Sequence, residues 1–222
     1  MRIYQIVSSV IVLGTALPVW LHWRATGAFN AHQAALAFFL VLNVLIALWE
    51  ICLFLRIDLI RAQHEDFRER FRGRELDRVK EFFKTKVPLT RVLSPTVWAE
   101  LWSSYSVFDP SYADRKSFGF FIDIGNGFST PLPCLLFLYG MTYEPFSARV
   151  LGVIGVLVFY QMWYGTIVYL TSYVMNKRYV GHSFSNVALF VGLSNGLWLT
   201  FPLWGIAVAL SMIVSNTYAV VR

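Results

Sequence analysis

Residues 31–55 read AHQAALAFFLVLNVLIALWEICLFL, a run in which Glu50 is the one Asp, Glu, Lys or Arg. At about 1.5 Å per residue, a helix of this length crosses a hydrocarbon core of roughly 30 Å. The sequence therefore predicts an all-α integral membrane protein, a bundle of five transmembrane helices. The four other apolar stretches long enough to span a bilayer are residues 3–22, 118–140, 148–173 and 184–213.

The overall composition supports a membrane location. Of the 222 residues, 57% are hydrophobic and 14% charged, and the mean hydropathy is +0.55, which is unlike a soluble globular domain. We expect one domain over residues 1–222 in contact with a lipid bilayer: the endoplasmic reticulum membrane in a eukaryote, the inner membrane in a bacterium. Cys52 and Cys134 both fall in predicted membrane helices, which argues against a disulfide framework.

Most of the charged side chains, and half of the net charge of +6, lie in residues 56–116, between the second and third apolar stretches. Basic and acidic side chains are interleaved there, a pattern typical of a solvated helix and not of a nucleic-acid surface. We predict an amphipathic basic linker lying on anionic headgroups, with an ordinary solvated helix as the alternative. The apolar residues that recur at roughly helical spacing in it are Phe67, Phe71, Leu76, Val79, Phe82 and Phe83.

Glu50 and Asp123 are the only acidic side chains inside the long apolar stretches. An ionisable group in hydrocarbon costs about 3 kcal/mol on insertion scales, so it usually faces a protein interior and has a function. Their distances in sequence from Arg56 and Lys116 place both about 9–10 Å in from the same membrane face. We predict that they are a catalytic pair. The alternatives are that Glu50 snorkels toward Arg56 and that Asp123 compensates a helix dipole.

Polar side chains on three predicted helices are candidates for binding a substrate. An indole in a dry site stabilises a cation by about 2 kcal/mol, so Trp198 is a candidate for stabilising a cationic ligand or intermediate. The alternatives are that the amides bridge helices and that Trp198 only packs. These candidates are Asn126 on the stripe of Asp123, Gln161 and Tyr164 on one stripe of the fourth helix, and Asn195 and Trp198 on one face of the fifth.

No cofactor site is evident in the sequence. The four histidines show no ligand spacing with cysteines or acids, so we expect no zinc site. Neither a phosphate-binding glycine loop nor the serine elbow of a hydrolase is present. We therefore expect neither a metal nor an organic cofactor.

The segment 101–112, LWSSYSVFDPSY, resembles the Leu-Trp-x-x-Tyr-x-x-x-Asp-x-x-Tyr pattern of the emopamil-binding protein family, whose members share the EXPERA domain. Continuing without a gap, Asp123 occupies the position where the sterol isomerases of that family carry a catalytic Glu, and Glu50 can be placed on a second-helix Glu. One departure is Ile46, where the isomerases have a His. By this resemblance the substrate-binding candidates extend to Trp102, Tyr105, Asp109 and Tyr112.

Two later segments extend the resemblance to roughly residues 40–215. The segment 195–202, NGLWLTFP, is similar to the family's Asn-x-Leu-Trp-Leu-x-x-Pro segment, whose Asn and Trp line a ligand cavity. Tyr164-Gly165 followed by Tyr169 looks like its fourth-helix segment. The resemblance thus implies an intramembrane ligand cavity lined in part by Asn195 and Trp198.

The resemblance implies sterol double-bond isomerisation, in which Glu50 and Asp123 relay a proton and Trp198 faces a carbocation. Two other functions stay open. An acid-initiated terpenoid cyclase or isomerase is favoured by Ile46 and by the Asp at position 123. A non-catalytic sterol or cationic-amphiphile binder is compatible with buried carboxylates. The expected partners are a bilayer and a sterol or terpenoid, with no nucleic acid, and a homodimer is left open.

Overall fold

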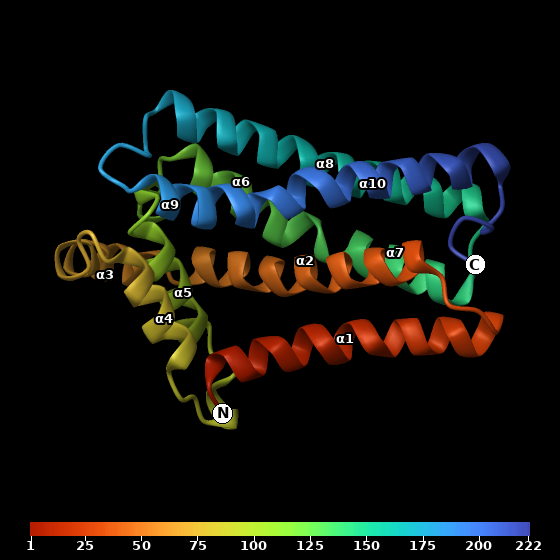
Figure 1. Cartoon of the computed structure of the whole chain (residues 1–222), viewed down its shortest axis with the longest axis horizontal. Helices are drawn as coiled ribbons and strands as arrows, with labels where there is room; N and C mark the ends of the chain where they lie inside the picture. The colour runs from red at the N-terminus through yellow and green to blue at the C-terminus, as the bar shows by residue number, and fades with distance from the viewer. The chain divides into compact units, whose positions relative to one another are not determined.

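The computed structural model describes residues 1–222 and contains helices with no β-strand (Figure 1). Short connections and one longer helical segment join the long apolar helices. The long helices are α1 (Ile3–Thr26), α2 (Ala31–Leu55), α8 (Ala148–Met175) and α10 (Ser194–Ser215), the last preceded by α9 (Phe184–Val187) and a π-helical turn (Ala188–Leu193). The other helices are α3 (Ile57–Arg70), α4 (Glu75–Lys84), α5 (Pro95–Ser106), α6 (Phe118–Ser129) and α7 (Pro131–Tyr143), with 3-10 turns η1 (Leu89–Arg91) and η2 (Pro110–Ala113).

The predicted membrane class is confirmed at the level of helix length and composition. Four helical segments are long and apolar enough to span a bilayer, and a fifth span results if the bent pair α6 and α7 is counted as one. Every predicted apolar stretch begins where a helix begins, and the helices end up to four residues later than expected. The chain is therefore an all-α, multi-pass membrane protein.

The third predicted helix, residues 118–140, was wrong as one continuous element. Helix α6 ends at Ser129, and α7 begins at Pro131. Proline lacks the N–H of a helix interior and is favoured in the first helical turn, where no partner is needed. The apolar stretch is therefore two helices joined at Thr130.

The chain forms two compact units, which we call unit 1 and unit 2. Helices α1, α2, α8 and α10 contribute residues to both. The single-domain assignment over residues 1–222 stays a prediction. Unit 1 comprises Met1–Val7, Ala47–Phe128 and Ile167–Gly196, and unit 2 comprises Ser8–Ile46, Ser129–Thr166 and Leu197–Arg222.

Unit 2 has an apolar core built from α2, α7, α8 and α10. Gly152 of α8 lets α10 approach closely, because a Cβ there would lie 2.6 Å from the Ala209 carbonyl oxygen. Small residues commonly permit such contacts between membrane helices, where van der Waals packing replaces the hydrophobic effect as the driving force. The largest fully buried side chains of this core are Phe39, Phe137, Phe159, Leu36, Leu40, Met141 and Leu151.

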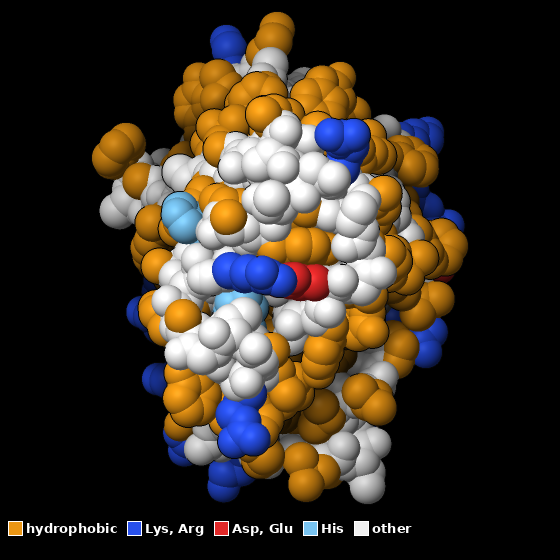
Figure 2. All heavy atoms as spheres, turned by 90° about the vertical axis from the view of Figure 1, so that its right-hand side faces the viewer, with side chains coloured by type: hydrophobic (Ala, Val, Ile, Leu, Met, Phe, Trp, Pro, Cys, Tyr) orange, Lys and Arg blue, Asp and Glu red, His pale blue; other side chains and the backbone are white.

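Polar contacts tie down the end of unit 2 that holds the α7–α8 loop and the C-terminus. Arg222 Nε donates to Glu144 at 2.8 Å, and the Tyr218 hydroxyl donates to the Phe146 carbonyl at 2.9 Å. Asn30 donates to the Arg222 carbonyl. Figure 2 shows the face at this end, where hydrophobic side chains predominate and basic groups are scattered.

The segment 56–116 is a helical subassembly of unit 1 and not a single amphipathic helix. Helix α5 packs against α3 and α4 (Figure 1). Phe71 and Phe82, expected to face headgroups, are 5% and 0% exposed because they pack inside the protein. These two side chains therefore stabilise the fold of the linker itself, and its position on the membrane surface stays a prediction.

A buried arginine links the three helices of this subassembly. Arg78 of α4 donates to Glu100 of α5 at 3.3 Å, and its guanidinium lies 4.2 Å from the centroid of the Phe67 ring on α3. A cation over an aromatic face contributes about 1–2 kcal/mol when partly desolvated. The interleaved charges of the linker are thus partly structural.

Candidate functional site

Glu50 of α2 and Asp123 of α6 are brought together inside unit 1. Glu50 is 6% exposed, Asp123 is half-buried, and their carboxyl groups lie close enough for their negative charges to repel. Gly127 makes this proximity possible, because a Cβ there would lie 2.9 Å from Glu50 Cβ and 3.1 Å from the Ala47 carbonyl oxygen. The sequence predicted two acids at one depth, and the fold places them side by side.

The burial of Glu50 argues against the alternative in which its side chain snorkels toward water. A snorkelling carboxylate would extend toward water and toward Arg56. Arg56 instead donates to the Thr96 hydroxyl at 3.3 Å. Glu50 therefore faces the protein interior.

Tyr112 lies beside the carboxyl pair. Its hydroxyl is within hydrogen-bonding reach of the Asp123 carboxyl. Burial raises the pKa of the Tyr112 phenol, and the negative charge of Asp123 raises it further. The phenol therefore stays protonated and can donate to Asp123 over the whole working pH range.

Aromatic rings of α5 and η2 form a cluster next to this pair. The Trp102 and Tyr112 ring centroids are 5.1 Å apart, and those of Tyr105 and Tyr112 are 5.0 Å apart. Trp102 is fixed to α2 because its Nε1 donates to the Trp49 carbonyl at 2.6 Å. Three of the residues selected by the resemblance thus lie together with Glu50 and Asp123 in one unit.

Asp109 is fully buried, and protein groups occupy its carboxylate. It accepts from the Tyr169 hydroxyl at 2.9 Å, from Arg178 Nη1 at 2.7 Å and from the Ser111 backbone N–H at 3.0 Å. A buried charge is tolerated only with such compensation. The contacts of Asp109 therefore hold η2, which carries Tyr112, in place, and they occupy the carboxylate oxygens that a ligand would need.

Tyr105 connects Asn195 to the same cluster. Its hydroxyl is within hydrogen-bonding reach of Tyr169 and Asn195, and burial raises the pKa of its phenol. The Asn195 amide also donates to the Val191 carbonyl at 2.7 Å. Asn126 lies on α6, half-buried and one turn after Asp123.

Three predicted substrate-binding residues belong to unit 2. Trp198 Nε1 donates to Asn43 Oδ1 at 2.9 Å, and its ring packs edge-on against Phe39. Gln161 donates to the Ser129 hydroxyl, and Tyr164 is 53% exposed and stacked on Tyr160. Their contacts in unit 2 are those of helix packing, and their role at a ligand stays a prediction.

Arg178 is the residue of this network that sequence reasoning missed. The signal that could have found it is Asp109, a carboxylate set among apolar and small residues, which needs a cation from elsewhere in the chain. Arg178 Nη1 also donates to Ser111 at 2.6 Å, and Nη2 donates to Ser172 at 2.9 Å.

The structure contains no group of three His, Cys, Asp or Glu side chains arranged to hold a metal ion. Comparisons with protein-family models, with curated proteins and with solved structures gave no match to this chain. The function is therefore argued mainly from the geometry within unit 1, and secondly from the resemblance of segments 101–112 and 195–202 to known motifs.

Proposed function

We propose that the chain is a membrane-embedded isomerase that shifts a carbon–carbon double bond in a sterol-like lipid. The observation that carries the proposal is the pair Glu50 and Asp123, two carboxyl groups within apolar helices that lie close enough for their negative charges to repel. Double-bond migration needs one acid and one base on the same substrate. The proposal includes a ligand cavity beside the pair and membership of the EXPERA-sharing family.

In the proposed reaction one carboxyl group protonates an alkene carbon, and the adjacent carbon becomes a carbocation. The other carboxylate then removes a proton from the carbon on the far side of that cation, and the double bond forms there. The substrate gains and loses one proton, so its formula is unchanged. A proton returns through the carboxyl pair before the next turnover.

The surroundings of the pair suit a positively charged intermediate. Tyr105, Tyr112 and Trp102 present aromatic rings nearby, and an aromatic face stabilises a desolvated cation by about 2 kcal/mol. The Tyr112 phenol would hold Asp123 in position. In the proposal Asn195 orients a carboxyl group, and Asn126 lines the substrate.

The same aromatic cluster favours a second candidate, a binding protein for a cationic amphiphile. An ammonium group and a carbocation present the same charge to aromatic faces and carboxylates. A third version keeps the acid chemistry and replaces the sterol with a terpenoid. The three differ in the product formed, so one labelling experiment separates them.

The test incubates purified protein in deuterated water with a Δ8 sterol and, separately, with lipid extract of its host, and follows products by mass spectrometry. We expect deuterium in an isomerised sterol, because the added proton comes from the carboxyl pair in exchange with solvent. Label only in a host terpenoid supports the third version. Label in neither, with tight binding of a cationic amine, supports the binding protein.

The matched variants separate catalysis from folding. Asp123→Asn and Glu50→Gln should each lower label incorporation by about 10²-fold or more. Asp66→Asn and Glu81→Gln make the same chemical changes at exposed carboxylates of α3 and α4 and should leave it unchanged. If Asp123→Asn and Glu50→Gln both keep full incorporation, the proton relay is wrong.

A further inference from the structure

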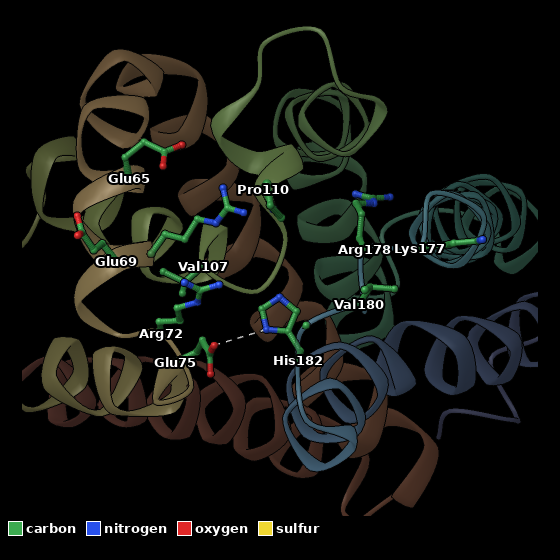
Figure 3. Close-up of a pocket in the computed structure, with 12 residues that line it drawn as sticks. Glu65, Glu69, Arg72, Glu75, Val107, Pro110, Lys177, Arg178, Val180 and His182 are labelled. Carbon is green, nitrogen blue, oxygen red and sulfur yellow. Dashed lines mark ion pairs between the residues drawn. The ribbon is translucent and has the colours of Figure 1, made fainter.

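A charged pocket of about 620 Å³ lies in unit 1, and neither Glu50 nor Asp123 lines it (Figure 3). Its walls come from α3, the turn before α4, the α5–η2 loop and the loop that follows α8. None of the residues assigned to the isomerase reaction lines it. It is thus a separate candidate site.

The pocket wall holds cations that the protein leaves without carboxylate partners. Arg68, Arg72 and Lys177 line it, and none of them takes part in an ion pair of the structure. Figure 3 shows the Arg72 guanidinium directed toward the His182 ring. Arg178 also lines the pocket, and its guanidinium is engaged, with Nη1 donating to Asp109 and Nη2 donating to Ser172.

The acidic residues of the wall are engaged or turned outward. Glu75 accepts from the Gly73 N–H at 3.0 Å and from Asn186 Nδ2 at 3.1 Å, and it lies 3.7 Å from His182 Nδ1. The Glu65 side chain is 78% exposed, and Glu69 points away from Arg72 (Figure 3). The lining thus contains three carboxylates as well as its cations, and Arg68, Arg72 and Lys177 are the cations that stay outside any ion pair.

The loop wall of the pocket begins just beyond the end of one apolar span, and the α3 wall begins at Glu65, ten residues beyond the end of another. Helix α2 ends at Leu55 and α8 ends at Met175, two residues before Lys177. Basic residues just beyond a span lie at the level of lipid headgroups. A ligand of this pocket can thus come from the bilayer or from water.

We propose that this pocket binds a phosphate group, carried by a lipid headgroup or free in solution. Guanidinium groups match the geometry of phosphate oxygens and form short, charge-assisted hydrogen bonds with them. Arg68 and Arg72 supply the main contacts, and Lys177 adds a point charge. The site stands independently of the isomerase reaction.

The test measures two probes on the full-length protein in neutral detergent. Native mass spectrometry measures binding of phosphatidic acid against phosphatidylcholine with the same acyl chains, and calorimetry measures binding of inorganic pyrophosphate. We expect Arg68→Gln and Arg72→Gln each to weaken binding by about tenfold or more. Lys177→Asn removes a charge while tolerating the left-handed backbone at φ 51°, and should weaken binding by a smaller factor.

Arg61→Gln is the matched control, because Arg61 is an exposed arginine of α3 that does not line the pocket. Arg68 and Arg72 are exposed as well, so equal thermal unfolding of all variants establishes that folding is intact. Selective loss with phosphatidic acid identifies a headgroup site, and selective loss with pyrophosphate identifies a soluble ligand; both support the proposal. Equal loss in Arg61→Gln, or binding of neither probe, overturns it.

Discussion

Arg178 decides whether the buried charge of Asp109 is tolerable. Its guanidinium joins Asp109 and Ser111, which cap and form η2, to Ser172 of α8. Gly119 of α6 passes so close that an added Cβ would lie 2.5 Å from Ser111 Oγ. One ion pair therefore fixes the turn that carries Tyr112 next to α6.

Replacing Arg178 with Met should destabilise the protein by about 3–5 kcal/mol, because it leaves the Asp109 charge buried without a partner. The double variant Asp109→Asn with Arg178→Met removes that charge and should recover part of the loss. Chemical unfolding in detergent measures both. Equal destabilisation of the single and double variants would contradict an electrostatic origin.

His64 predicts a pH dependence of stability. Its Nδ1 lies 3.0 Å from the Ser106 hydroxyl. Burial lowers the pKa of the His64 imidazole from its ordinary value of 6.5, with Glu65 opposing the shift and the Arg68 cation adding to it. The unfolded chain then binds the proton more readily, so this contribution to stability is complete above pH 6.5 and is lost as the pH falls below it.

Thermal unfolding between pH 7.5 and 5.5 tests this dependence. We expect the wild type to lose more stability across that range than a His64→Asn variant. His32 is exposed in unit 2, so His32→Asn serves as the control and should behave like the wild type. A wild-type profile matched by His64→Asn would contradict the assignment to His64.

Helices α2 and α6 meet at Gly127, and this contact sets the spacing of the two acids. Gly127→Ala should push the helices apart, lower isomerase activity by about tenfold or more, and destabilise the protein by about 1–3 kcal/mol through overpacking. Gly125→Ala is the control on the same helix, because a Cβ there would meet nothing within 4 Å. It should keep activity and gain slightly in helix propensity. Equal activity of the two variants would contradict the role of this contact.

The topology of the whole molecule depends on whether α6 and α7 cross the membrane as one broken span. We expect five spans, which places the exposed residues Lys116 and Pro145 on opposite sides. Cysteines introduced at these positions should be labelled from opposite faces of sealed vesicles. The native Cys52 and Cys134 are buried and provide the background. Labelling of both from one face would make the pair a re-entrant hairpin.

The sequence predicted the spans because a long apolar run has few stable structures other than a helix that crosses the bilayer. It also placed Glu50 and Asp123 at one depth, since helix rise fixes that distance. It missed the break at Thr130 and Pro131, where proline is compatible with a kinked helix and with a new helix start. It missed the ion pair of Arg178 with Asp109 and the packing among the helices of the linker, because these contacts join residues that are far apart in the chain.

The central claim is that Glu50 and Asp123 act as one proton-handling unit. The most direct measurement is the turnover of the labelled sterol by Glu50→Gln, by Asp123→Asn and by the double variant. Groups that act together are non-additive, so the double variant should be no slower than the slower single variant. A loss equal to the product of the two single losses would show independent roles and contradict the account.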